Sequence, residues 1–161
     1  MEHCFVNIKR LKNTIKFIDK IEEPILCIGK ENPFDRELCK KLGVEYNYTA
    51  TDADFDIKYY DFKTIFCFDV IEYLMNPLLF LINNKSCNII YLCYQYNPII
   101  YFWSKSHFVE YPKKSFKKLL EKAGYKICKY ERIWFETLNF KGIRPVIRTL
   151  TNSRYYYKLR I

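Results

Sequence analysis

Near its start the chain reads Pro24-Ile25-Leu26-Cys27-Ile28-Gly29-Lys30-Glu31-Asn32-Pro33-Phe34-Asp35. The continuous apolar run at 25–28 is typical of a strand that is buried on both faces of a sheet. Gly29 then supplies a turn. Asn32 followed by Pro33 predicts the start of a helix, because asparagine caps free N–H groups and proline suits the first helical position. Strand, turn and helix in this order predict the opening of a nucleotide-binding α/β sheet.

The remainder of the chain continues to alternate strands with helices. Apolar, β-prone runs predict strands at 44–50, 64–68 and 88–94. Helical spacing of apolar residues predicts helices at 7–21, 33–42, 77–82 and 113–123. Three further strand-like runs follow at 125–135, 143–150 and 154–161. We therefore expect a Rossmann-like α/β sheet that is mostly parallel, has helices on both faces and ends in an antiparallel hairpin.

The length, net charge and hydropathy of the chain limit its domain number, its candidate partners and its relation to a membrane. Its 161 residues make about one domain, which we place at 1–161, with an amphipathic helix in 1–23 and the sheet core in 24–161. A net charge of +9 makes nucleic acid a candidate partner, although dispersed lysines also simply hydrate a surface. The uncharged run 86–104 approaches the length of a membrane span, but polar residues and a proline interrupt it, so we expect no span.

The cysteines and histidines argue against a metal site. There are seven cysteines, an odd number without a C-x-x-C pair, and only two histidines. Cys27, Cys67, Cys93 and Cys128 fall inside strand-like runs, which predicts buried, reduced thiols. The first residues lack the apolar stretch of a secretory signal, so we expect a cytoplasmic protein without disulfides.

Three predicted strands end in groups that can contact a nucleotide. After the first strand, Gly29 lets a ligand approach the backbone, and the next helix offers its positive end. After the second strand, Asp52, with Asp54 as a competitor, can accept hydrogen bonds from ribose hydroxyls. Asp69 follows the strand at 64–68. Because ligands of such sheets bind at the carboxyl ends of the strands, we expect these groups to share one site.

Two later stretches resemble a known family. The segment Asp69-Val70-Ile71-Glu72-Tyr73-Leu74-Met75-Asn76-Pro77 is similar to the pattern D-V-L-E-H-L-x-D-P of the class I S-adenosylmethionine-dependent methyltransferases, in their type-11-like group. The stretches His107–Tyr111 and Ser115–Tyr125 resemble the "H-x-x-x-F" and "L-x-x-L-L-x-x-A-G-F" segments of the same group. The resemblance runs from about residue 24 to the C-terminus.

The resemblance implies S-adenosyl-L-methionine as cofactor, S-adenosyl-L-homocysteine as its product, and no metal. Gly29 would lie under the methionine part of the cofactor and Asp52 would hold its ribose. The cofactor-binding residues that the resemblance implies are Gly29, Lys30, Asp52, Ala53, Phe68 and Asp69. It leaves the catalytic residues and the methyl acceptor unassigned, and a homodimer is a candidate assembly.

The turn after the first strand departs from the family pattern D-x-G-x-G-x-G. Cys27 replaces the leading acid, and Glu31 and Pro33 replace two of the glycines. A Cβ at either position is expected to crowd the methionine part or to force a different turn. Only 9 residues separate Asp52 from Phe62, too few for the usual helix and third strand, so we expect a sheet that is trimmed there.

Three functions stay open on the sequence. We favour an active methyltransferase with a non-standard turn. The alternative is a catalytically inactive protein of the same fold that binds or scaffolds nucleic acid or a protein. A dinucleotide oxidoreductase is disfavoured, because the chain lacks G-x-G-x-x-G and ends in antiparallel strands. For Tyr73 and His107 we expect packing or surface roles, and for the aromatic stretch 99–103 a lid, a self-association patch or a core segment.

Overall fold

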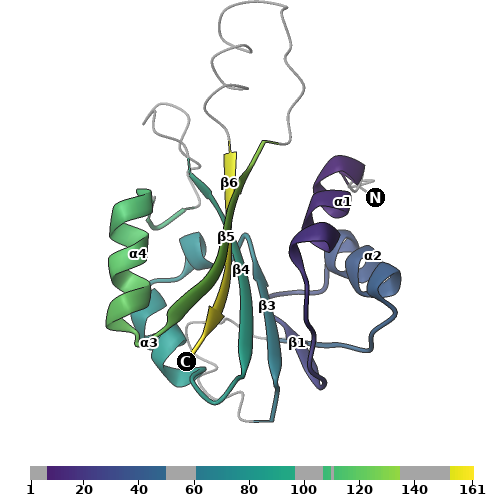
Figure 1. Cartoon of the computed structure of the whole chain (residues 1–161), viewed down its shortest axis with the longest axis horizontal. Helices are drawn as coiled ribbons and strands as arrows, with labels where there is room; N and C mark the ends of the chain where they lie inside the picture. The colour runs from purple at the N-terminus through teal and green to yellow at the C-terminus, as the bar shows by residue number, and fades with distance from the viewer. Residues whose placement is uncertain (1–6, 50–60, 97–106, 110, 135–152) are drawn as a thin grey trace, which may run out of the picture.

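One sheet organises the molecule. The computed structural model describes residues 7–49, 61–96, 107–109, 111–134 and 153–161. The strands are β1 (Ile25–Cys27), β2 (Asn47–Tyr48), β3 (Thr64–Phe68), β4 (Ile89–Tyr96), β5 (Lys126–Ile133) and β6 (Ser153–Arg160). They form a six-stranded sheet in the order β2-β1-β3-β4-β6-β5 (Figure 1).

The strand directions confirm the expected mixed sheet. The pairs β1–β2, β1–β3 and β3–β4 are parallel. The pairs β4–β6 and β5–β6 are antiparallel, so β6 lies between β4 and β5. The sheet is thus parallel along the early strands and closes with the predicted antiparallel hairpin. At the β2 edge, where the sequence predicts a trimmed sheet, residues 50–60 lie outside the described part of the chain.

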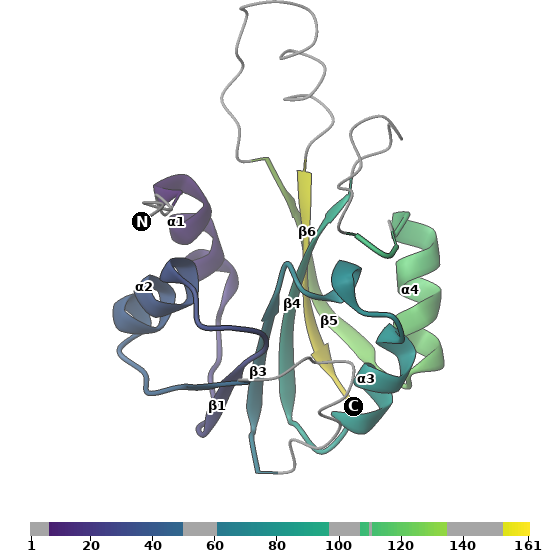
Figure 2. The ribbon, with the colours of Figure 1, turned by 180° about the vertical axis from the view of Figure 1, so that it is seen from behind.

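Helices cover both faces of the sheet. Helices α1 (Ile8–Phe17) and α2 (Pro33–Leu42) lie on one face, and α3 (Pro77–Asn83) and α4 (Lys113–Lys122) lie on the other, with a short 3-10 turn, η1 (Ile71–Tyr73), before α3 (Figures 1 and 2). The alternation of side chains along β4 separates two apolar cores. Tyr91 and Cys93 pack with the α1–α2 layer, whereas Leu92 and Tyr94 pack with the α3–α4 layer.

The expected helix signals work as predicted. The Asn32 side chain accepts a hydrogen bond from the backbone N–H of Asp35 at 2.9 Å, and Pro33 stands at the first position of α2. Gly43 ends α2 with a left-handed φ of 68°. Asn76 caps α3 in the same way as Asn32 caps α2. These signals therefore fix where the α2 layer begins, which matters for the site below.

Three expectations from the sequence are wrong in detail. The helix expected at 7–21 ends at Phe17, because the Tyr91 hydroxyl accepts hydrogen bonds from the backbone N–H groups that follow the helix. Of the strand expected at 44–50, the described residues 44–49 form a strand only at Asn47–Tyr48. Cys128 is exposed, whereas Cys27, Cys67 and Cys93 are buried as expected.

The strand-like run 143–150 and the aromatic stretch 99–103 lie outside the described residues. Among the described helices, none is long and apolar enough to span a bilayer.

Candidate functional site

A cavity of about 410 Å³ lies at the carboxyl ends of β1 and β3. Three segments line it: the start of α1, the turn after β1 together with the start of α2, and residues 68–70 after β3. Of the residues that the sequence predicts, Gly29, Lys30, Phe68 and Asp69 line this cavity. Asp52 and Ala53 lie outside the described residues. The structure therefore brings four predicted positions from two strand ends to one place.

The turn at Gly29 requires glycine for its backbone conformation. Its φ is +100°, a value that side-chain-bearing residues rarely adopt, whereas a Cβ would meet only the Val70 methyl group at 3.7 Å. The Thr49 hydroxyl oxygen accepts a hydrogen bond from the Gly29 N–H at 2.7 Å. Since Thr49 directly follows β2, the second strand holds the turn of the first in position.

The two residues that replace family glycines, Glu31 and Pro33, lie differently with respect to the cavity. Glu31 turns aside and does not line the cavity, because its Oε1 accepts hydrogen bonds from Arg36 Nε at 3.1 Å and from the Tyr46 hydroxyl at 3.0 Å. Pro33 does line the cavity, at the start of α2. The Glu31 side chain therefore pairs outside the cavity, while Pro33 forms part of its wall.

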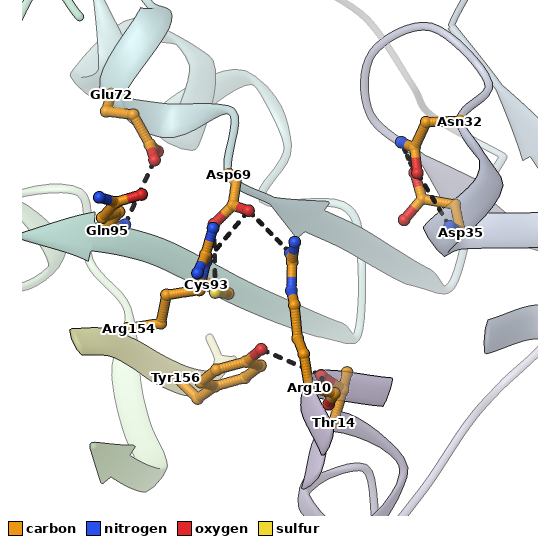
Figure 3. A network of polar contacts seen from close by, with 10 residues as sticks. All are labelled: Arg10, Thr14, Asn32, Asp35, Asp69, Glu72, Cys93, Gln95, Arg154 and Tyr156. Carbon is orange, nitrogen blue, oxygen red and sulfur yellow. Dashed lines mark hydrogen bonds and ion pairs between the residues drawn. The ribbon is translucent and has the colours of Figure 1, made fainter. Parts of the chain in front are cut away.

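Asp69 is the centre of a charge cluster at the cavity wall (Figure 3). Its Oδ2 lies 2.8 Å from Nη2 of Arg10, and its Oδ1 lies 2.9 Å from Nε of Arg154. The Cys93 thiol donates to the same carboxylate at 3.6 Å. The three charged side chains are each about one-fifth exposed or less, at 21%, 15% and 20% for Asp69, Arg10 and Arg154. Burial alone would raise the pKa of Asp69, but the two guanidinium groups outweigh burial and hold its pKa below the usual value.

Arg10 reaches the cavity from α1. Its guanidinium stacks over the Phe34 ring, with Cζ 3.9 Å from the ring centroid. Its backbone N–H donates to the Asn7 side chain at 2.9 Å, which caps the helix that carries it. Its Nε is buried and has no hydrogen-bond partner within the described part of the chain. Among the contacts of the described residues, Arg10 therefore binds Asp69 through Nη2, and its buried Nε binds no partner.

Asp35 is a second carboxylate on the cavity wall, at the start of α2. Its side chain is only 5% exposed, and its Oδ2 accepts a hydrogen bond from the Asn32 side-chain amide at 2.6 Å. Burial raises the pKa of Asp35 to about 6, although the Asn32 hydrogen bond and the charge of Arg10 lower it. The sequence presents Asp35 only as a helix-start residue; its role as a cavity carboxylate depends on α1 and β3 packing around it.

Glu72 joins the two stretches that resemble the methyltransferase family. It is 1% exposed, and its Oε1 accepts the backbone N–H of Gln95 at 3.2 Å. Its backbone oxygen accepts from Phe108 N at 2.9 Å, which ties residues 107–109 to η1. Burial and the nearby Asp69 charge raise the pKa of Glu72 to about 8. The rings of Tyr73 and His107 meet edge to face, with their centroids 4.7 Å apart.

Sequence reasoning missed Arg10, Asp35 and Arg154 as members of the site. Arg154 lies 85 residues from Asp69 in the chain, and no local sequence pattern predicts their contact. The spacing of Asn32 and Asp35, three residues apart at a helix start, was the available signal for Asp35. No group of three or more His, Cys, Asp or Glu within residues that the structure describes is arranged to hold a metal ion.

Comparison with known proteins gives matches in structure but not in sequence. No family model and no curated protein sequence matches the chain. An S-adenosylmethionine-dependent methyltransferase from Archaeoglobus fulgidus superposes with a TM-score of 0.67 over 96% of this chain and 93% of that one, at 15% identity. A structure described as a complex of the Haloferax volcanii Trm112 methyltransferase activator and a putative methyltransferase gives 0.69 over 96% and 89%, at 7% identity.

A third neighbour limits what the fold alone says about the reaction. The [4+2]-cyclase SpnF superposes with a TM-score of 0.61 over 94% of this chain and 80% of that one, at 9% identity. One fold therefore carries more than one chemistry, and the reaction has to be argued from the site. Taken with the strand order, the cavity at the ends of β1 and β3 and the matched motifs, these likenesses establish that this chain has the fold of the class I S-adenosylmethionine-dependent methyltransferases.

Proposed function

We propose that the protein binds S-adenosyl-L-methionine in the cavity beside Gly29 and transfers its methyl group to an acceptor. The observation that carries the proposal is the open cavity of about 410 Å³ at the glycine turn, from which the Glu31 side chain is directed away. This volume lies within the range of small-molecule sites, roughly 300–1,000 Å³. The cavity occupies the strand ends where ligands of doubly wound sheets bind.

The residues on the wall suit such a ligand. Gly29 and Lys30 would lie under its methionine part, and Phe68, whose ring meets that of Phe34 edge-on at 6.1 Å, would supply an apolar border. We propose Asp52 and Ala53 as contacts to the ribose end. When bound, the cofactor supplies an electrophilic methyl on sulfonium sulfur, and the protein contributes by orienting the two reactants in line and excluding water.

Asp69 has a different part in this proposal from the one that the sequence suggests. Because both of its oxygens pair with arginines, it contributes to the site mainly by fixing Arg10 and Arg154 at the border. We assign no catalytic acid or base, and the methyl acceptor stays unidentified. The buried Glu72 supports the backbone around η1.

A second candidate is a binding protein of the same fold without catalysis. The observation in its favour is the exposed face of α4, which carries Lys113, Lys114, Lys117, Lys118 and Lys122 against a single acid, Glu121. Lys113 also lies 4.2 Å from the centre of the Tyr130 ring. Exposed lysines on one helix face are compatible with an anionic partner such as nucleic acid, although the Tyr130 ring itself is partly buried.

Calorimetric titration separates these functions. We expect micromolar binding of S-adenosyl-L-methionine and S-adenosyl-L-homocysteine, no comparable binding of NAD, and loss of binding in Asp52→Ala. Salt-dependent binding of RNA or DNA without binding of either cofactor form would instead support the second candidate. Binding of NAD alone would contradict both and favour an oxidoreductase.

A further inference from the structure

A cavity of about 490 Å³, the α4–β5 groove, lies between helix α4 and strand β5 (Figure 1). Its volume is within the range of small-molecule sites, roughly 300–1,000 Å³. None of its lining residues lines the cavity beside Gly29. The residues that matter here come from α4, β5 and β6, and are Lys113, Lys117, Glu121, Ile127, Tyr130 and Tyr157. A ligand in this groove would therefore stay apart from a cofactor at the glycine turn.

Cations outnumber anions along the α4–β5 groove. Lys113, Lys117 and Lys126 line it, against one acid, Glu121. Lys113 and Lys126 form no ion pair within the described residues. Lys117 lies 3.6 Å from Glu121, but both side chains are more than half exposed, and an exposed pair of this kind is weak. Since Lys113 and Lys117 are four residues apart on α4, they present two ammonium groups on one side of the helix.

The floor of the α4–β5 groove is aromatic. The Tyr130 ring is partly buried, and the Lys113 ammonium lies 4.2 Å from its centre. Tyr157 packs beside Tyr130, with ring centroids 5.1 Å apart, and is only 2% exposed. The Tyr157 hydroxyl is buried and makes no hydrogen bond within the described part of the chain. A buried hydroxyl without a partner is costly in free energy, and an acceptor on a ligand would remove that cost.

These features are complementary to a small aromatic anion. The ammonium groups suit a phosphate or a carboxylate, whereas Ile127 and the tyrosine floor suit a flat apolar body. A neutral ring would leave the lysines without an anion, and an inorganic anion would leave the floor in contact with water. A nucleic acid strand would contact the exposed lysines of α4 without distinction, whereas only Lys113 and Lys117 of these lysines line the groove.

We propose that the α4–β5 groove binds a small aromatic anion. Lys113 and Lys117 hold its anionic group, Ile127 and Tyr130 contact its ring, and the Tyr157 hydroxyl donates a hydrogen bond to one of its oxygens. This binding site is additional to the proposed methyl transfer and does not depend on it. Its ligand is not the methyl acceptor, because the groove is lined from α4, whereas the cavity at the glycine turn is lined from α1 and α2.

Calorimetric titration with phenyl phosphate tests the site, since this probe carries both an anionic group and a ring. Wild-type protein should bind it at least about tenfold more tightly than inorganic phosphate, which lacks the ring, or phenol, which lacks the charge. Lys113→Gln and Lys117→Gln should each weaken binding at least about threefold. Lys118→Gln is the matched control, because Lys118 is exposed on the same helix but does not line the groove, and it should keep the wild-type affinity.

Tyr157→Phe tests the buried hydroxyl separately. It should weaken binding of phenyl phosphate at least about threefold. The temperature of thermal unfolding of the free protein should stay unchanged or rise, because the substitution removes a polar group without a partner. Unchanged affinity in Tyr157→Phe would overturn the assignment, since the floor of the groove would then take no part in binding.

The remaining outcomes locate the probe. Equal affinities for phenyl phosphate, inorganic phosphate and phenol would overturn the inference, and so would an equal loss of binding in Lys113→Gln and Lys118→Gln, which indicates general surface charge. Saturating S-adenosyl-L-homocysteine should leave binding of phenyl phosphate unchanged, and competition between the two would place the probe at the glycine turn instead. A protein that binds phenyl phosphate in the groove but does not bind S-adenosyl-L-homocysteine would support this inference and contradict the proposed function.

Discussion

Arg154 on β6 donates a hydrogen bond from Nε to the Asp69 carboxylate, at 2.9 Å from Oδ1 and 3.2 Å from Oδ2. The same carboxylate binds Arg10 of α1 at 2.8 Å. One acid thereby joins a helix, a loop and a strand from separate parts of the chain. Because the Asp69 side chain is only 21% exposed and lies between two guanidinium groups, its removal leaves two partly buried cations without their counterion.

The first prediction concerns this shared acid. Asp69→Asn should lower the free energy of unfolding by about 3 kcal/mol, because both arginines lose their counterion in a partly buried setting. Urea denaturation measures the change. Glu31→Gln, which removes an exposed pair with Arg36, serves as control and should change stability by no more than about 1 kcal/mol. Equal small losses in both variants would show that the cluster is solvated like a surface pair.

The second prediction concerns two of the three described glycines that have a positive φ. Gly29 has a φ of +100° and Gly43 a φ of +68°, and neither position meets a tight contact for an added Cβ. Alanine at either should therefore destabilise the fold by about 1–2 kcal/mol through backbone strain. Only Gly29→Ala should also weaken cofactor binding, since Gly29 lines the cavity and Gly43 ends α2 outside it. Unchanged binding in Gly29→Ala would count against the cavity as the cofactor site.

The third prediction is a pH dependence with a defined sign. Burial raises the pKa of Asp35 to about 6 from a usual value near 4, so the folded state binds more protons than the unfolded state between these values. The contribution of Asp35 to the free energy of unfolding is therefore fully present below about pH 4. It is lost as the pH rises through about 6, and the total loss is about 2–3 kcal/mol.

Asp35→Asn removes this loss and should raise the unfolding free energy at pH 8 relative to wild type, measured by urea denaturation between pH 5 and 8. Asp19→Asn is a control of opposite sign. Its hydrogen bond to Lys158 lowers the pKa of Asp19 to about 2, so its stabilisation is present above pH 4 and is lost as the pH falls towards 2. Since Asp19 is half exposed, the effect of this control at pH 8 should be a small destabilisation.

A fourth prediction concerns the link between α1 and the sheet. The Tyr91 hydroxyl on β4 lies 2.7 Å from the Asp19 carboxylate and accepts the Lys20 N–H at 3.1 Å, just after α1 ends. Tyr91→Phe should lower stability by about 1–2 kcal/mol, because these backbone groups lose their buried partner. Tyr46→Phe, which removes a bond to the Glu31 carboxylate, should stay within about 0.5 kcal/mol in the same denaturation assay.

Local signals in the sequence were sufficient for most of the fold. The cap at Asn32, the stop at Gly43 and the second cap at Asn76 depend on neighbouring residues, and each appears where it is expected. The end of the first helix is different. Its apolar spacing continues to Ile21, but the helix ends at Phe17, and the Tyr91 hydroxyl binds the backbone that follows. Because Tyr91 is more than seventy positions away, the residues near position 18 do not predict this contact.

The residues of the candidate site also fall into those that the local sequence predicts and those that it does not. Gly29 and Asp69 stand directly after strands, so strand prediction finds them. Arg10 and Arg154 reach the site only because α1 packs beside α2 and β6 pairs with β4, contacts that one sequence does not encode in any local spacing. The partners of Glu31, Arg36 on α2 and Tyr46 before β2, are likewise contacts that its position in the turn does not predict.

The place of β6 in the sheet has a consequence for biosynthesis. Within the described strands, β5 pairs only with β6, and β6 also supplies the second arginine of Asp69. As the ribosome releases the chain in order, β5 emerges before the strand to which it must attach. During synthesis, residues 126–133 therefore lack their pairing partner, and Asp69 lacks Arg154, until residues 153–160 have left the ribosome.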